Sequence, residues 1–168
     1  MKAILSAAAV AACLIATPAL AAPQTLYGTL GVTRIDADQG LGFTAVTARA
    51  GTRFVKYIGA EVEFTQGFGS SKASDGTKVS LRHDYAVYMV NALPITDNVD
   101  VYARLGYGVT KISSKALLGT DSLEGVRYGA GIQAYFDDAN GVRVDYTRLD
   151  NNDVNADTYS VSYVRKFF

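Results

Sequence analysis

The sequence predicts an all-β fold, an eight-stranded antiparallel up-and-down transmembrane β-barrel. Apolar and polar side chains alternate along most of the chain, and this period of two is that of a β-strand. Residues 1–21 have the composition of an export signal. The last expected strand, residues 157–168, ends on two phenylalanines, and aromatic strand ends are typical of the girdle of a membrane barrel.

The amino-terminal segment has the parts of a cleavable secretory signal peptide. Lys2 supplies a positive charge, residues 3–16 are largely apolar, and Ala19 and Ala21 are the small residues that precede a cleavage site. The apolar stretch is shorter than the ~20 residues that a spanning helix needs, which makes a single membrane anchor the weaker alternative. We therefore expect a signal at 1–21 and one barrel domain at 22–168.

Composition argues against several classes of function. If Cys13 leaves with the signal, the mature chain has no cysteine for a disulfide or a thiolate site; cleavage before Cys13 as a lipoprotein is a minor alternative. Loss of Lys2 changes sixteen basic and sixteen acidic residues to fifteen and sixteen, a balance that argues against nucleic acid as a partner. With one histidine and no calcium-loop spacing, we expect no metal and no cofactor.

Three expected strands lie nearest to the signal. The first two, residues 25–35 and 41–54, alternate weakly between turn-rich breaks. The third, residues 57–68, is clearer because Glu61 and Glu63 alternate with apolar neighbours. The two carboxylates therefore share one face of that strand.

The fourth expected strand, residues 79–93, is strongly two-faced. Leu81 and His83 fall on its apolar face, and Arg82 and Asp84 fall on its polar face. A lone histidine on an apolar face is a weak sign of catalysis. We expect it at a membrane interface.

Four more strands complete the set, at residues 99–110, 126–136, 142–147 and 157–168. In the first three, arginines and aspartates occupy one face and apolar side chains the other. In the last, tyrosine and valine side chains share a face with Phe167. Eight is an even number of segments of the length that crosses a bilayer as a tilted strand.

The connections alternate in length, as they do in outer-membrane barrels with long outer loops and short inner turns. Longer breaks are expected near 36–40, 69–77, 113–122 and 150–156, and tighter ones near 55–56, 94–98 and 137–140.

The charged residues of the strands lie opposite the apolar stripes. An arginine that faces lipid near the bilayer midplane costs ~2–4 kcal/mol, so we expect these charges to face inward, where they can pair. A soluble carrier of the lipocalin type would have the opposite polarity. The expected interior charge network comprises Arg49, Arg53, Glu61, Glu63, Arg82, Asp84, Asp100, Arg104, Arg127, Arg143 and Asp145.

Two interpretations of this network remain. In the first, it is a structural plug, because the interior of an eight-stranded barrel is only just wide enough for side chains. In the second, it is a selectivity path for small ions or polar solutes. Catalysis is disfavoured, since arginines beside Glu61 and Glu63 oppose the raised carboxyl pKa that general acid catalysis needs.

Two passages resemble a known family. Residues 51–63 (GTRFVKYIGAEVE) look like the second-to-third-strand unit of the outer-membrane β-barrel domain family, which includes the transmembrane domain of outer membrane protein A. Residues 104–108 (RLGYG) look like its fifth strand. The resemblance implies a Gram-negative outer-membrane protein that the barrel-assembly machinery inserts, with Tyr163, Phe167 and Phe168 as the assembly signal.

Together these observations favour a small structural or surface barrel, without enzymatic activity, that contacts outer-membrane lipid as a monomer. A narrow porin is the first alternative, because of the charged inward face. A soluble ligand-binding barrel is the second, and it requires an apolar interior.

Overall fold

The structure is a computed structural model. The amino-terminal segment with its expected signal, and the final residue Phe168, lie outside the described residues. No helix within the described ranges is long and apolar enough to cross a membrane. The structure describes residues 25–37, 41–68, 71–72, 78–114, 119–151 and 155–167.

The described residues form eight long strands and one two-residue strand. The long strands alternate between buried and exposed side chains, as the period of two predicts. In chain order the strands are β1 (Thr25–Ala37), β2 (Leu41–Arg53), β3 (Ile58–Phe68), β4 (Ser71–Lys72), β5 (Lys78–Thr96), β6 (Val99–Ser114), β7 (Gly119–Tyr135), β8 (Asn140–Asp150) and β9 (Ala156–Lys166).

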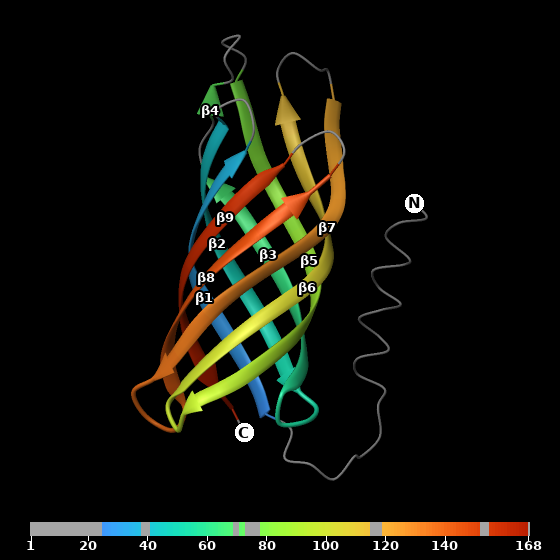
Figure 1. Ribbon diagram of the computed structural model, residues 1–168. Coiled ribbons are helices and arrows are strands. Elements are labelled where there is room, and N and C mark those ends of the chain that lie inside the picture. Colours follow the sequence, from blue (N-terminus) through green and yellow to red (C-terminus); the bar gives the residue numbers. More distant parts are fainter. Residues whose placement is uncertain are drawn as a thin grey trace.

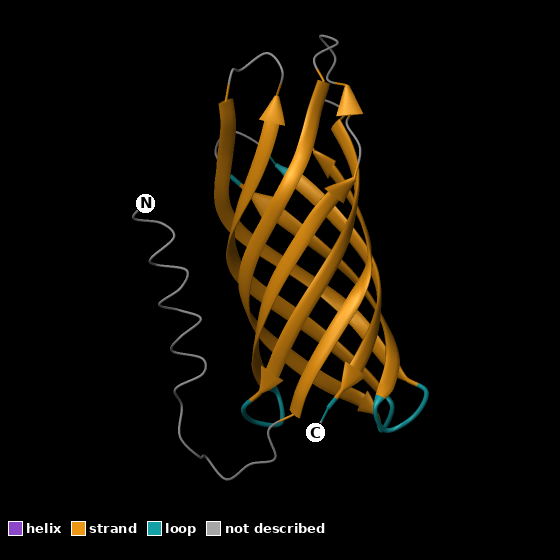
Figure 2. Ribbon diagram, turned by 180° about the vertical axis from the view of Figure 1, so that it is seen from behind, coloured by secondary structure: helices purple, strands orange, loops and turns teal. Residues whose placement is uncertain are grey.

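The eight long strands close into a barrel. Each pairs in antiparallel fashion with the long strands before and after it in the chain, and β1 pairs with β9. β3 therefore pairs directly with β5, and the short β4 pairs only with the start of β5. Figures 1 and 2 show the tilted strands wound around a common axis. Closure leaves no sheet edge within the ring, which is the condition for strands in lipid. The predicted eight-stranded up-and-down barrel is confirmed.

The strands β5, β6 and β7 are longer than predicted. The break expected at 113–122 is much shorter, since Ser114 of β6 already pairs with Gly119 of β7. The pairing of β3 with β5 stops at His83, whereas β5, β6 and β7 stay paired with one another and extend beyond the ring at the upper end of Figure 1. Hydrophobic alternation marks only the part of a strand whose two faces meet different surroundings, so it does not reveal this extension.

The short connections lie at the opposite end, where β9 also ends (Figure 2). In the turn before β8, the Asp137 carboxylate accepts hydrogen bonds from the Asn140 side chain and from the backbone N–H groups of Ala139 and Asn140. These bonds lower the pKa of Asp137 and explain why a tight turn forms there.

The outer surface is apolar and the inner surface is polar over most of the barrel. On β8, Val144 is 53% exposed, whereas its neighbours Arg143 and Asp145 are 1% and 3% exposed. Facing aromatic pairs on the outside include Tyr146 with Tyr159, whose ring centroids are 5.4 Å apart. A soluble carrier has the reverse polarity, so that alternative is wrong.

Candidate functional site

The centre of the barrel holds a cluster of six charged side chains from four strands. Residues two apart on one strand point to the same side, which brings both glutamates of β3 and two charges of β8 into the interior. All six side chains are nearly or completely buried. The cluster, called here the central charge cluster, consists of Arg49 on β2, Glu61 and Glu63 on β3, Arg104 on β6, and Arg143 and Asp145 on β8.

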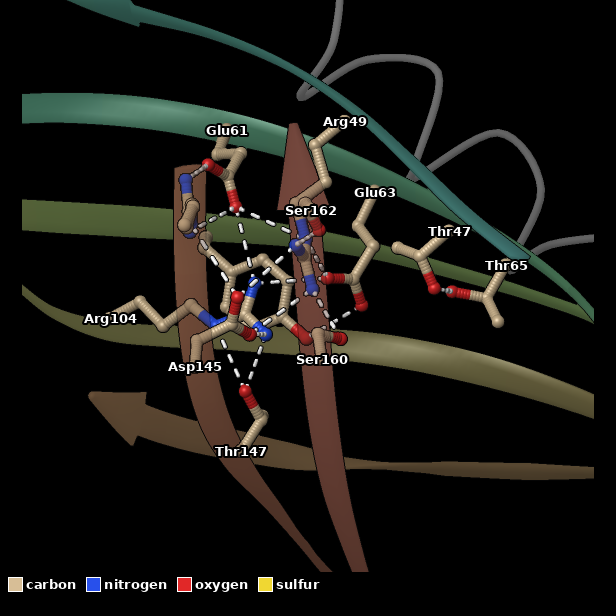
Figure 3. A network of polar contacts seen from close by, with 12 residues as sticks. Thr47, Arg49, Glu61, Glu63, Thr65, Arg104, Asp145, Thr147, Ser160 and Ser162 are labelled. Carbon is tan, nitrogen blue, oxygen red and sulfur yellow. Dashed lines mark hydrogen bonds and ion pairs between the residues drawn. The ribbon is translucent and has the colours of Figure 1, made fainter. Parts of the chain in front are cut away.

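Arg104 contacts all three carboxylates of the cluster (Figure 3). Its Nη1 lies 3.2 Å from Glu61 Oε1 and 2.9 Å from Glu63 Oε2. Its Nη2 lies 2.9 Å from Asp145 Oδ1, and its Nε donates to the Thr147 hydroxyl. This arginine therefore joins the charges of β3 to those of β8 across the lumen.

The other two arginines complete the pairing. Arg143 donates two hydrogen bonds to Glu61, at 2.6 and 3.2 Å, and such forked geometry is among the stronger forms of ion pair. Arg49 Nε donates to Glu63 at 2.6 Å, and its Nη2 lies 3.1 Å from Asp145. Each carboxylate of the central charge cluster is thus held by at least two arginines.

Neutral side chains satisfy much of the remaining hydrogen-bonding capacity. The Tyr27 hydroxyl donates to Glu61 and the Tyr88 hydroxyl donates to Glu63. Arg49 also donates to Ser160 and Ser162 of β9. These partners lie on the inward face that the period of two assigns. They carry no charge, so alternation alone does not identify them as members of the network.

Two further ion pairs flank the cluster. Toward the long loops, Arg127 on β7 donates to both oxygens of Asp84 on β5. Toward the short turns, Arg53 on β2 lies 2.5 Å from Asp100 on β6. Among the described residues, the interior therefore holds five arginines (Arg49, Arg53, Arg104, Arg127 and Arg143) and five carboxylates (Glu61, Glu63, Asp84, Asp100 and Asp145).

Arg82 departs from the expected network, because its side chain is exposed. The pairing of β5 with β6 shifts between Leu81 and His83, so Arg82 is an extra residue in a β-bulge. The bulge reverses the alternation in the part of β5 that precedes Arg82, and Leu81, expected on the outside, is buried inside. His83 lies beside the exterior aromatic Phe64 and makes a hydrogen bond with Gln66 at 2.9 Å.

Small residues make room for the large interior side chains. A Cβ atom on Gly108 would lie 2.5 Å from the guanidinium carbon of Arg127, and one on Gly51 would lie 2.4 Å from the Tyr27 ring. Glycine at these positions lets a tyrosine and an arginine lie flat against the neighbouring strand, Tyr27 of β1 over β2 and Arg127 of β7 over β6.

The arrangement is suited to filling the lumen. The side chains of Arg104, Glu61 and Asp145 have no exposed surface, so at this level a water-sized sphere does not reach them. Their charges are compensated at short range, which is what a buried charge requires. In the described part of the chain, no group of three or more His, Cys, Asp or Glu residues is placed to hold a metal ion.

Comparisons with known proteins agree with this architecture. The family model described as "Outer membrane protein beta-barrel domain" matches residues 5–167. No curated protein sequence matches the chain.

Solved structures of three barrels are similar to the chain. The attachment invasion locus protein Ail of Yersinia pestis is 19% identical over 86% of this chain and 97% of that chain, with a TM-score of 0.60. Neisserial surface protein A is 12% identical over 87% and 98%, with a TM-score of 0.64. The amino-terminal barrel of Pseudomonas aeruginosa OprF is 9% identical over 84% and 97%, with a TM-score of 0.61. At these identities the likeness concerns the fold.

Proposed function

Because the chain belongs to the outer membrane protein β-barrel domain family and lies in the cell outer membrane, we propose that it is a structural or surface barrel whose lumen is closed by ion pairs. The observation that carries this proposal is the central charge cluster. Three arginines and three carboxylates fill one level of the lumen and have almost no exposed surface. A solute that crossed this level would have to break several buried pairs at once.

A narrow porin is the alternative that this proposal replaces. A pore needs a continuous polar path, whereas the arginines here are engaged with carboxylates at 2.6 to 3.2 Å. Charged pore linings attract ions when part of their charge is uncompensated. The five inward arginines are matched by five inward carboxylates, and Lys166, on the same inward face of β9 as Ser162 and Val164, lies over the Tyr135 ring at the end with the short turns.

Liposome swelling tests the proposal. The refolded barrel is placed in liposomes loaded with an impermeant polymer, and the liposomes are diluted into isotonic glycine or arabinose. We expect swelling at the rate of protein-free liposomes. Swelling that increases with the amount of barrel, in samples where heat-modifiable gel mobility shows a folded protein, would favour the porin.

We also propose that the barrel is not an enzyme. Glu61 and Glu63 are two carboxylates on one face of β3, but both are held by arginines and closed off from solvent. His83 is directed at Gln66 on the outside of the barrel rather than at a serine or a carboxylate. Catalysis would need a nucleophile and its base within hydrogen-bond reach, in a place that substrate can enter.

Export and assembly complete the proposal. Residues 1–21 would be removed as a signal, and the barrel-assembly machinery would insert residues 22–168 as a monomer. The side chains of Tyr163 and Phe167 are exposed on the outer face of the last strand, and the Phe167 N–H donates to the Leu26 carbonyl of β1. With Phe168, these aromatics would form the assembly signal.

A further inference from the structure

The interior of the barrel changes character toward the long loops. Beyond the pair of Arg127 and Asp84, the inward side chains are uncharged and, apart from Thr158, mostly apolar. Phe43, Ala45 and Leu81 form a buried cluster there, and Ile35, Leu41 and Ile112 pack against it.

A bulge contributes to this apolar layer. With regular pairing, Leu81 would face the lipid with Tyr85, because the two residues are four positions apart. The extra residue at Arg82 turns Leu81 inward, where it is 5% exposed. Bulges that redirect a side chain are frequent beside active sites. This bulge places Leu81 in the wall of a cavity.

The apolar layer surrounds a cavity of about 120 Å³. Its walls are apolar side chains of β1, β2, β5, β6, β7, β8 and β9, and its floor is the upper part of the charged interior. An apolar cavity of roughly 150 Å³ is known to stay dry and to bind benzene. The wall residues include Phe43, Leu81, Ile112, Leu123, Leu149 and Ala156.

The floor of the cavity is polar but electrically neutral. Arg127 Nη1 donates to Asp84 at 2.6 Å, and Glu63 is held by Arg49 and Arg104. Arg127 is 6% exposed, and its Nε has no hydrogen-bond partner among the described residues. A buried donor without an acceptor is costly, so a ligand that supplies an acceptor would gain from it. Since the charges are paired, a neutral ligand fits better than an ion.

We propose that this cavity binds a neutral molecule made of a single apolar ring and one hydrogen-bond acceptor, of the size and chemistry of a phenol. The ring contacts the leucine, isoleucine and phenylalanine side chains of the wall. The acceptor lies toward Arg127. The site lies on the loop side of the central charge cluster, shares only Glu63 with it, and needs no opening of the lumen below.

Titration with phenol, followed by methyl NMR of the barrel in lipid nanodiscs, tests this inference. Leu81, Ile112 and Leu149 report on the cavity, while Leu105 and Ile132, which are exposed on the outside, report on phenol dissolved in the bilayer. We expect saturable shifts of the cavity methyls and linear, unsaturated shifts of the outer ones. Equal, unsaturated shifts in both sets, or no shifts in the cavity, would overturn the inference.

A cavity-filling variant sharpens the test. Ala156→Leu adds bulk to the wall and should weaken phenol binding by about tenfold or more. Ala130→Leu, on the outer face of β7, is the matched control and should leave the binding unchanged. If Ala156→Leu lacks heat-modifiable mobility, Ala37→Leu at the end of β1 fills the same cavity from a half-buried position. Unaltered saturation in a folded filled variant would place the bound phenol elsewhere and contradict the inference.

Discussion

Arg104 hydrogen-bonds to all three carboxylates of the central charge cluster, Glu61, Glu63 and Asp145. It is 3% exposed. Without it, three buried carboxylates would share two arginines. Loss of one partner from a buried charge network leaves uncompensated charge, which costs more than the loss of the contact itself.

Arg104→Met should therefore lower the free energy of unfolding by about 3–5 kcal/mol. Urea unfolding of the refolded barrel in lipid vesicles measures the change. Circular dichroism or gel mobility follows the unfolding, because the chain has no tryptophan for fluorescence. Arg82→Met is the matched control, because this arginine is exposed and its replacement should cost less than about 0.5 kcal/mol. Equal losses for the two variants would contradict the burial assigned to Arg104.

The period of two accounts for much of the residue placement. Of the eleven charged residues assigned to the interior, the structure places ten inside and Arg82 outside. The bulge at Arg82 depends on local pairing between β5 and β6, which alternation in one strand does not reveal. The choice of ion-pair partners was also beyond the sequence pattern, because Arg49 and Asp145 meet only when the barrel closes.

At the scale of the elements, β9 closes the barrel, because it is the last strand and pairs with the first. It pairs with β8 on one side and with β1 on the other, and Tyr163 and Phe167 both face outward. The structure thus has Tyr163 and Phe167 on one face, as the alternation of the last strand predicts. The role in assembly proposed for them concerns the chain before the barrel closes.

Replacing Tyr163, Phe167 and Phe168 together with alanine should reduce the amount of folded barrel in the outer membrane of a Gram-negative host severalfold, since the recognition signal is lost. Density fractionation with heat-modifiable gel mobility measures this amount. Phe136→Ala is the control, because Phe136 is an exposed aromatic outside the last strand. A similar loss in the control would indicate that aromatic contacts with the membrane, and not recognition of the last strand, explain the result.

The limits of the strands were harder to predict than their number. The sequence pattern indicated a start of β7 at residue 126, but the strand begins at Gly119. The additional residues pair with β6 as far as Ser114 through backbone hydrogen bonds. Backbone pairing does not require alternating side chains, so a polar extension resembles a loop in the sequence.

At the scale of the whole molecule, the inverted polarity matches a lipid surrounding. Val144 lies on the outside between Ile132 and Val161, which pair with it on the adjacent strands. On β8, Tyr146 lies toward one end of the barrel from this position, and Val142, paired with Tyr163, lies toward the other. This arrangement puts Val144 near the middle of the apolar band.

Val144→Arg should therefore destabilise the barrel in lipid vesicles by about 2–4 kcal/mol, the cost of an arginine near the midplane. Val144→Leu keeps the apolar surface and serves as the control. Equilibrium unfolding in urea measures both. If Val144→Arg were as stable as Val144→Leu, this face would not be in contact with hydrocarbon.

The central claim is that the paired charges close the lumen, and single-channel recording in planar bilayers tests it most directly. The folded wild-type barrel should give no conductance steps above the lipid baseline at either polarity. Reproducible steps from the wild type, increasing in number with the amount of folded barrel added, would contradict the claim and show that ions pass the level of Arg104.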